Sequence, residues 1–251
     1  MSEYDAEHSD RYDDFNASKD YQSEVQNLCS LHYTFNLKDK KVLDVGCGTG
    51  KHLKLFSDRG WDIEGVDISA SMLEKASERL PEDTPLHLDI NDASNNHDFV
   101  ISLFNVVNHL TPDTDALDSF FSSIAKKMNT GGLLIFDLFN YDAMVKSPPV
   151  VLTRTITDPD LKDGIDENRE LKIVPYLDGQ SLTLDYVVDA HLEHSVDHTI
   201  WSFEQLFASL SKAGLGLLQC YELPSYQLVS KESIKSYKYM CVANKIRRRK
   251  S

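Results

Sequence analysis

The chain has 251 residues, of which 41% are hydrophobic and 26% are charged, so it can bury a sizeable core as one large domain or as a domain with an insertion. Its 26 basic and 40 acidic residues leave a net charge of −14, and a field of that sign repels nucleic acid and anionic lipid. We therefore expect no nucleic-acid partner and no membrane partner.

Three features favour a cytoplasmic location. The N-terminus is acidic and lacks the apolar stretch of a secretory signal, and the apolar run from Phe99 to Leu110 is too short to span a bilayer. The four cysteines show no CxxC spacing and are expected to be reduced thiols. The basic residues at 245–250 are expected to be a solvated chain end rather than a contact for nucleic acid or membrane.

Residues 1–36 are expected to form a lid followed by a helix. The first 20 residues hold seven acids and two bases, with aromatic residues such as Tyr4 and Tyr12 between them. Purely disordered tails carry fewer aromatics, so we expect this segment to fold over another surface. Residues 21–35 place four side chains on one helical face, Tyr21, Val25, Leu28 and His32.

Strands alternate with helices from residue 37 to residue 147. Short apolar runs predict strands at 41–45, 61–66, 85–88, 99–103 and 133–136, and helices at 52–59, at 69–80 and after Thr111–Pro112. A capping box of Ser71 and Glu74 marks the second helix, Thr111–Pro112 starts the third, and Gly131–Gly132 ends it. This alternation predicts a parallel sheet that is covered by helices on both faces.

The pattern changes between residues 148 and 200 to strands without helices. Strands are expected at 150–157, 171–177 and 181–192, with a hairpin turn at Asp178–Gly179. The alternating pattern resumes at 201–246 with a helix at 202–213 and strands at 217–221 and 237–244. The expected fold is α/β, a Rossmann-like doubly wound, mostly parallel sheet built from 37–147 and 201–246, with an inserted antiparallel β-sheet at 148–200 that forms an acceptor wall or a dimer contact.

The most specific motif is the glycine loop in Val42–Gly50, VLDVGCGTG, which joins a strand to a helix. Its third glycine comes one residue too early for a dinucleotide loop, and no Lys-Ser/Thr pair follows as in a phosphate loop. Asp67 closes the next strand, where a carboxylate can accept both hydroxyls of a ribose, and Asp89 closes the third. An acidic, glycine-lined crevice suits a positively charged nucleoside without phosphates.

This loop resembles motif I of the class I S-adenosylmethionine-dependent methyltransferases, and the resemblance covers roughly residues 40–140 and 200–244. It implies S-adenosylmethionine as cofactor and S-adenosylhomocysteine as product. Asp67–Ile68 resembles the ribose-binding pair, Asp89–Ile90 the pair that brackets adenine, and Ser102–Phe104 the segment beside the methionine. The implied cofactor-binding residues are Tyr4, Tyr12, Lys19, Tyr21, Asp44, Gly46, Cys47, Gly48, Gly50, Asp67, Ile68, Met72, Asp89, Ile90, Leu103 and Phe104.

Other segments resemble particular groups within this class of methyltransferases. Tyr4, Tyr12 and Lys19–Tyr21 resemble the lid of the sugar N,N-dimethyltransferases of macrolide pathways, and 101–110 with 135–139 resembles methyltransferases of bacterial surface-polysaccharide clusters. Three cofactor residues have a second explanation. Asp44 could support the loop, Met72 could be core, and Cys47 is expected to be a small turn residue rather than a nucleophile.

The resemblance implies transfer of an activated sulfonium methyl, so catalysis is mainly alignment and exclusion of water. An amine acceptor needs little help from a base, whereas a hydroxyl acceptor needs one. His109 and Asn105, after the fourth strand, and Asp137, at the end of the fifth, are the catalytic candidates. Capping of the next helix would explain His109 and Asn105 equally well.

A metal site is not expected. Strand alternation puts His191 on the face opposite the apolar residues, and His194 and His198 are expected to be solvated in a polar turn. We therefore expect a methyltransferase of a small-molecule acceptor, such as a sugar amine or hydroxyl, with a homodimer as a further possibility. The alternatives are an S-adenosylmethionine-binding partner protein without turnover and an NAD-dependent oxidoreductase, which the glycine spacing disfavours.

Overall fold

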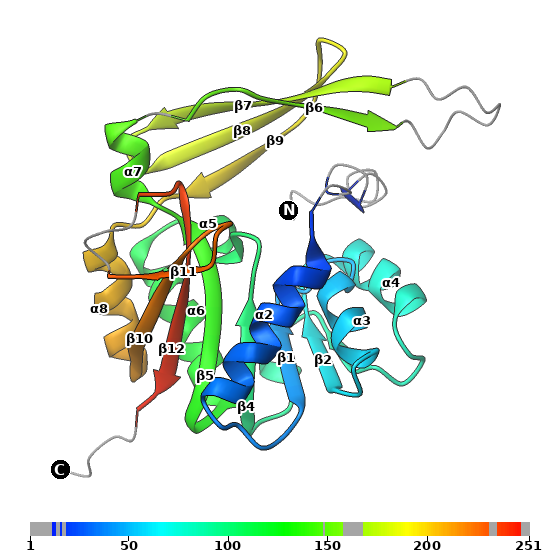
Figure 1. Ribbon diagram of the computed structural model, residues 1–251, viewed down its shortest axis with the longest axis vertical. Coiled ribbons are helices and arrows are strands. Elements are labelled where there is room, and N and C mark those ends of the chain that lie inside the picture. The colour runs from blue at the N-terminus through cyan, green and yellow to red at the C-terminus, as the bar shows by residue number, and fades with distance from the viewer. Residues whose placement is uncertain are drawn as a thin grey trace.

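The computed structural model describes residues 12–13, 16, 19–147, 149–157, 168–230 and 235–246, which form an eight-stranded and a four-stranded sheet (Figure 1). The helices are α2 (Tyr21–Thr34), α3 (Lys51–Ser57), α4 (Ala70–Arg79), α5 (Val106–Leu110), α6 (Thr114–Lys127), α7 (Tyr141–Lys146) and α8 (Phe203–Ala213), with a 3₁₀ turn η1 (Ile90–Asp92). The larger sheet contains β1 (Lys41–Val45), β2 (Asp62–Val66), β3 (Leu86–His87), β4 (His97–Ser102), β5 (Met128–Phe139), β10 (Leu215–Glu222), β11 (Gln227–Val229) and β12 (Lys238–Lys245). The smaller sheet contains β6 (Leu152–Thr157), β7 (Asn168–Asp178), β8 (Ser181–Val188) and β9 (His191–Thr199).

The larger sheet has the strand order β11-β10-β12-β5-β4-β1-β2-β3. Strands β1 to β5 are parallel, whereas β12 runs antiparallel to both β5 and β10. The order reverses between β1 and β4, so the loops after these two strands meet at one edge of the sheet. This arrangement confirms the predicted doubly wound, mostly parallel fold.

Each face of the larger sheet has its own apolar core, because alternate side chains of a strand point to opposite faces. Helices α2, α3 and α4 cover one face, where Leu28 packs against Phe99, and α6 and α8 cover the other, where Phe121 packs with Val100. All four of these side chains are fully buried. The face predicted for residues 21–35 is the buried face of α2.

The smaller sheet is an antiparallel meander of β6, β7, β8 and β9. Figure 1 shows it lying across one end of the larger sheet, above α5 and α2. Asn108 of α5 ties the two sheets together, because its amide donates to the Thr199 carbonyl at 2.7 Å and accepts the Phe139 N–H at 2.9 Å. The predicted separate antiparallel sheet is confirmed.

The capping of two helices differs from the prediction, although α4 starts where it was expected. The N-cap of α4 is Ser69, whose hydroxyl accepts the backbone N–H three residues later, so Ser71 and Glu74 lie inside the helix and form no capping box. The N-cap of α6 is Asp113, whose carboxylate accepts the Ala116 N–H at 2.8 Å, so the predicted start at Thr111–Pro112 comes too early. In both cases the capping oxygen that reaches the first free N–H groups sets the start.

The segments on either side of α6 also differ from the prediction. Helix α6 ends at Lys127 and β5 begins at once, so Gly131–Gly132 lies within the strand instead of ending the helix. The predicted turn that carries His109 is the short helix α5. Asn105 precedes that helix in the left-handed conformation and makes no side-chain capping bond, so the capping role considered for it is absent.

The predicted strand at 181–192 is two strands. Asp189 and Ala190, with φ of +46° and +69°, reverse the chain between β8 and β9 without a glycine. His194 and His198 therefore lie within β9 rather than in a polar turn, and His198 is only 8% exposed. The expectation that these histidines are solvated is wrong for His198.

Candidate active site

A cavity of about 540 Å³ opens at the carboxyl ends of β1, β2 and β4, where the strand order reverses. The glycine loop and Asp67 form one side, and the segment 88–90 with the first turns of α6 forms the other. Residues of α6 three or four positions apart line this wall, Ala116, Ser119, Phe120 and Ser123. Such spacing places them on one helical face. Ala116 and Phe120, with Leu88 and Ile90, make this the more apolar side of the cavity, although two serines and Asp89 also line it.

The three glycines of the loop have different surroundings. Gly46, at φ +81°, has no room for a Cβ because Val106 fills that space. Gly48, at φ +52°, borders the cavity, and a Cβ there would meet nothing within 4 Å. A Cβ on Gly50 would instead meet the side chains of α4. The loop therefore presents bare backbone to the cavity at Gly46 and Gly48, whereas Gly50 permits close packing of α3 on α4.

Asp67 fixes the glycine loop and faces the cavity. Its Oδ2 accepts the Gly48 N–H at 2.8 Å, and its Oδ1 accepts the Ser69 N–H at 2.9 Å. Burial raises the pKa of Asp67, and these two backbone hydrogen bonds oppose the rise. Each carboxylate oxygen retains a lone pair beyond these bonds, so Asp67 can also accept the hydroxyl groups of a ligand.

Asp44 lies in β1 just before the loop and is 1% exposed. Its Oδ2 has no hydrogen-bond partner among the described residues. Burial raises the pKa of Asp44 to about 6, with His52 opposing the rise and Asp67 reinforcing it. A buried carboxylate that lacks a partner favours a nearby cationic ligand group. The charge of Asp44, the carboxylate oxygens of Asp67 that can accept hydroxyl groups, and the more apolar wall together fit a positively charged nucleoside.

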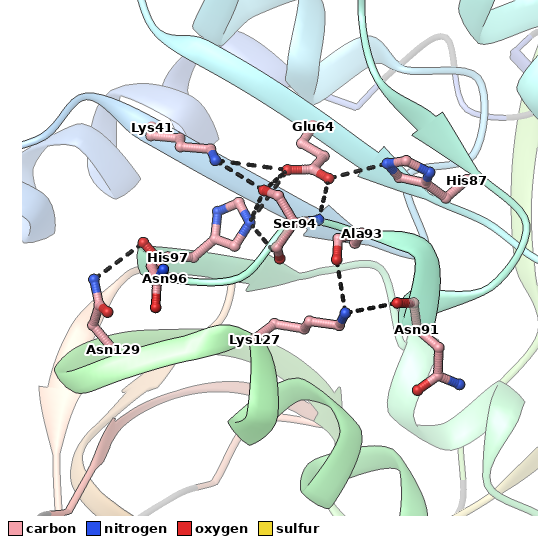
Figure 2. A network of polar contacts seen from close by, with 10 residues as sticks. All are labelled: Lys41, Glu64, His87, Asn91, Ala93, Ser94, Asn96, His97, Lys127 and Asn129. Atoms are coloured by element: carbon pink, nitrogen blue, oxygen red, sulfur yellow. Dashed lines mark hydrogen bonds and ion pairs between the residues drawn. The ribbon is translucent and has the colours of Figure 1, made fainter.

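A polar network holds the turn η1, which follows Asp89 at the apolar side of the cavity (Figure 2). Lys127, 7% exposed at the end of α6, donates to the carbonyls of Asn91 and Ala93 at 2.8 and 2.7 Å. Ser94, directly after the turn, donates its N–H and hydroxyl to Glu64 of β2 at 2.7 and 2.5 Å. The turn is thus fixed from α6 and from β2.

Glu64 is the centre of that network and is 3% exposed. His87 and His97 lie 3.0 and 3.3 Å from its carboxylate through their Nε2 atoms, and Lys41 lies 3.8 Å away (Figure 2). Burial opposes ionisation of Glu64, but the hydrogen bonds from His97 and Ser94 outweigh it and hold its pKa well below the usual range. Glu64 is therefore an anion that joins β1, β2, β3 and β4 beneath the cavity.

The described part of the N-terminal segment is attached to the glycine loop. The Asp13 carboxylate accepts the Thr49 hydroxyl at 2.8 Å and pairs with Lys51 at 3.2 Å. The Arg79 guanidinium donates to both Asp13 and the Thr49 carbonyl. Burial opposes ionisation of Asp13, but these partners lower its pKa. Tyr12 is thereby held at the cavity, as the lid hypothesis requires, whereas Tyr4 lies outside the described residues.

A second cavity of about 970 Å³ lies between the larger sheet and the smaller sheet. Its polar floor includes Lys19, Glu24, Asn105, Asp137 and Lys238. Its roof is the inner face of the smaller sheet, which contributes Leu152, Ile173, Pro175, Leu182, Leu184, Tyr186, His194, Val196 and His198. Burial opposes ionisation of Glu24, but the hydrogen bond from His52, the charge of His52 and the ion pair with Lys19 at 2.9 Å hold its pKa at about 2.

The two cavities share part of their walls. Among the described residues, three line both, namely Tyr12, Phe104 and His198. Phe104 and Asn105 stand side by side with φ of +74° and +62°, a conformation that L-residues rarely adopt. The Asn105 N–H donates to the buried Asp137 carboxylate at 2.7 Å, which fixes this strained turn. Burial raises the pKa of Asp137, and Lys238 and Lys19 oppose the rise.

The structure distributes the expected site residues over these two cavities. The first is lined by Tyr12, Gly46, Gly48, Asp67, Ile68, Met72, Asp89, Ile90, Leu103, Phe104 and His109. Lys19, Asn105 and Asp137 line only the second. Tyr21, Asp44, Cys47 and Gly50 line neither, and burial holds the pKa of the Cys47 thiol well above its usual range. In the part of the chain that the structure describes, no group of three or more His, Cys, Asp or Glu residues is placed to hold a metal ion.

A model of the methyltransferase domain family matches residues 18–178. The chain belongs to that family. Membership confirms the resemblance seen in the glycine loop and, with it, S-adenosylmethionine as the cofactor. Oxidoreductase chemistry with NAD has no support from this match.

Known members of the family resemble this chain to different extents. The dTDP-3-amino-3,4,6-trideoxy-alpha-D-glucopyranose N,N-dimethyltransferase of Streptomyces venezuelae is 33% identical over 138 residues, 53% of this chain and 58% of that protein. The dTDP-3-amino-3,6-dideoxy-alpha-D-glucopyranose N,N-dimethyltransferase of Streptomyces fradiae is 31% identical over 141 residues, 55% of each chain. The chain thus spans little more than half the length of these curated relatives.

Solved methyltransferase structures share the fold. An amino pentose methyltransferase from Micromonospora echinaspora superimposes with a TM-score of 0.73 at 19% identity, covering 96% of this chain and 98% of that chain. The superposition therefore spans both sheets, although identity at this level establishes the fold alone.

Proposed function

We propose that this protein transfers the methyl group of S-adenosylmethionine to the amine of a small, sugar-like acceptor. One observation carries the proposal: the cavity that fits the cofactor meets a second, larger cavity at a wall formed by Tyr12, Phe104 and His198. A methyl donor in one cavity and an acceptor in the other would approach each other where these three residues border both. The relatives that methylate dTDP-linked amino sugars support the class of acceptor.

The residues of the first cavity would bind and orient the cofactor, which supplies an activated methyl group. Asp67 would accept the ribose hydroxyls, and Asp89 with Ile90 would lie beside the adenine. Asp44 lines neither cavity and would attract a cationic part of the cofactor through its charge from behind the glycine loop. The segment that contains Tyr12 and Asp13 would exclude water, and Asp13 holds it against the glycine loop.

Asp137 is the proposed proton acceptor. It lines the acceptor cavity, is 3% exposed, and has a pKa raised by burial, so its carboxylate can take the proton that an amine loses when its nitrogen is methylated. His109 instead lines the cofactor cavity, and its Nδ1 lies 3.3 Å from the Asp197 carbonyl. This placement favours amine chemistry with Asp137 over hydroxyl chemistry with His109.

Methyl transfer from radiolabelled S-adenosylmethionine to dTDP-3-amino-3,6-dideoxy-α-D-glucose tests the proposal. In Asp137→Asn the amide oxygen can still accept the Asn105 N–H, so the turn should persist while kcat/KM for the amine falls by about tenfold, a small loss for a base because an amine needs little help from one. Asp142→Asn, an exposed change at the start of α7, is the matched control. Binding of S-adenosylhomocysteine without methylation of any amine or hydroxyl acceptor would support the non-catalytic alternative instead.

The inserted segment 148–200 is proposed as the acceptor wall, because its inner face lines the second cavity. A homodimer through its outer face remains a proposal, which sedimentation of the full chain would test. In the described part of the chain no helix is long and apolar enough to cross a membrane. We propose the cytoplasm as the location, since all four cysteines are free thiols.

A further inference from the structure

His198 stands out among the residues that line both cavities. It comes from β9 of the inserted sheet, whereas Tyr12 comes from the N-terminal segment and Phe104 from the turn after β4. Of these three side chains, Phe104 is apolar. A polar group at this wall is within reach of both bound reactants, so His198 and Tyr12 are the two side chains there that can form a hydrogen bond with an acceptor.

The direction of the His198 side chain follows from its strand. Residues 194, 196 and 198 of β9 all line the acceptor cavity, whereas Ser195 and Asp197 bond to side chains of β8 on the opposite face. Helix α5 holds the backbone on both sides of His198. Asn108 donates to the Thr199 carbonyl at 2.7 Å, and His109 contacts the Asp197 carbonyl at 3.3 Å.

The surroundings of His198 leave one of its ring nitrogens unused. The side chain is 8% exposed, its ring meets that of Phe139 edge to face at 5.3 Å, and its Nδ1 has no hydrogen-bond partner among the described residues. A buried polar atom without a partner costs about 1–3 kcal/mol, which a bound ligand can offset. The unused nitrogen therefore points to a ligand contact.

The charge of His198 suits a site where two cations meet. Burial lowers the pKa of His198 to about 3, the charges of His109 and Lys238 add to this effect, and hydrogen bonds to the Val196 and Leu182 backbone oppose it, so its imidazole is neutral at physiological pH. A neutral ring does not repel a sulfonium or an ammonium group, and its unprotonated nitrogen can accept one hydrogen bond. With so low a pKa the ring is too weak a base to keep a proton, which leaves that task to Asp137.

We propose that His198 is an acceptor-binding residue, which the inserted sheet supplies and which accepts a hydrogen bond from the acceptor amine beside the cofactor. This inference rests on the proposed function, because it assumes an acceptor in the second cavity. The hydrogen bond would turn the nitrogen lone pair toward the methyl group. The inserted sheet would then complete the active site rather than only enclose it.

Kinetics of two variants test this assignment with dTDP-3-amino-3,6-dideoxy-α-D-glucose as the probe. His198→Leu should lower kcat/KM for the probe by about 10- to 100-fold, whereas the calorimetric Kd of S-adenosylhomocysteine should change by less than about threefold. His198→Asn, which keeps a hydrogen-bonding side chain, should recover most of that loss. His191→Leu, an exposed histidine on the same strand outside both cavities, is the control and should resemble the wild type. Equal activity of His198→Leu and the control overturns the proposal.

A binding measurement separates this proposal from the proposed function. In the full chain with ¹⁵N-labelled histidine, the unprotonated ring nitrogen of His198 should shift upfield when the probe is added to the complex with S-adenosylhomocysteine. A shift of His198 without methyl transfer refutes the proposed function and supports the acceptor contact. Shifts of other histidines in the acceptor cavity without one at His198 refute the contact, whether or not methyl is transferred.

Discussion

Replacement of Asp44 by asparagine should change the pH dependence of folding stability. The buried carboxylate has a pKa of about 6 in the folded chain against a usual value of 3.8, so the folded state binds the proton more tightly than the unfolded state does. Wild-type stability contributed by this group is therefore present below pH 3.8 and is lost as the pH rises through about 6. Asparagine does not titrate and avoids this loss.

The magnitude follows from the two pKa values. A shift from 3.8 to about 6 corresponds to about 3 kcal/mol at full ionisation, of which about half is already lost at pH 5. The new amide adds a cost that does not depend on pH. The decisive quantity is therefore the stability of Asp44→Asn minus that of the wild type, which should rise by about 1.5 kcal/mol between pH 5 and pH 8.

Urea unfolding of the apoprotein at both pH values measures this difference. Asp62→Asn, an exposed change on the neighbouring strand β2, is the control and should show no such rise. Calorimetry should show weaker binding of S-adenosylhomocysteine to Asp44→Asn, by about tenfold, because the variant loses a buried negative charge that attracts a cationic ligand group from behind the glycine loop. A stability difference that is the same at pH 5 and pH 8 would refute the account of Asp44.

Three further changes address the cofactor cavity. Asp67→Ala should weaken S-adenosylhomocysteine binding by about 2–3 kcal/mol in calorimetry, and unchanged affinity in a folded variant would remove it from the ribose site. Gly46→Ala should lower the free energy of unfolding by about 2 kcal/mol because of its positive φ and its overlap with Val106, and adding Val106→Ala should restore part of that loss. Lys127→Met should weaken S-adenosylhomocysteine binding several-fold, because it releases the carbonyls of Asn91 and Ala93 and so loosens η1. Lys126→Met changes an exposed neighbour and should leave the affinity unchanged. Equal affinities of these two variants would contradict the role of the network.

The larger sheet and the cofactor cavity were predictable because both depend on local patterns. Short apolar runs identify the parallel strands, and strand ends in such a sheet necessarily meet at one edge. Asp67 and Asp89 therefore come together with the glycine loop whatever the packing of the helices. The contribution of α6 to the cavity wall could have been found in the same way. Ala116, Ser119 and Phe120 recur at helical spacing, on the face next to the buried core residues of the same helix.

The second cavity was not predictable because it depends on the position of one sheet over another. Asp189–Ala190 reverses the chain without glycine or proline, so the predicted strand continued through the turn to residue 192 and His198 was expected in a solvated turn. Its burial arises from contacts with Phe139 and α5, far away in the sequence. Asn105 and Asp137 were identified as site residues, but their hydrogen bond depends on the left-handed turn, in which Phe104 takes a conformation that its residue type does not predict.

The left-handed pair Phe104 and Asn105 has a consequence for how this protein could be stabilised. Glycine would relieve about 1 kcal/mol of backbone strain at either position, although at position 104 it would also remove the contacts of the Phe104 ring with Tyr12 and Lys19, and it would free the turn between the two cavities. A substitution that raises the heat resistance of the fold at these two residues would therefore also loosen the turn that we propose positions the reactants. We expect variants selected only for thermal tolerance to accumulate glycine at this turn and to lose turnover. Adaptation to high temperature that preserves activity must therefore change other parts of the fold.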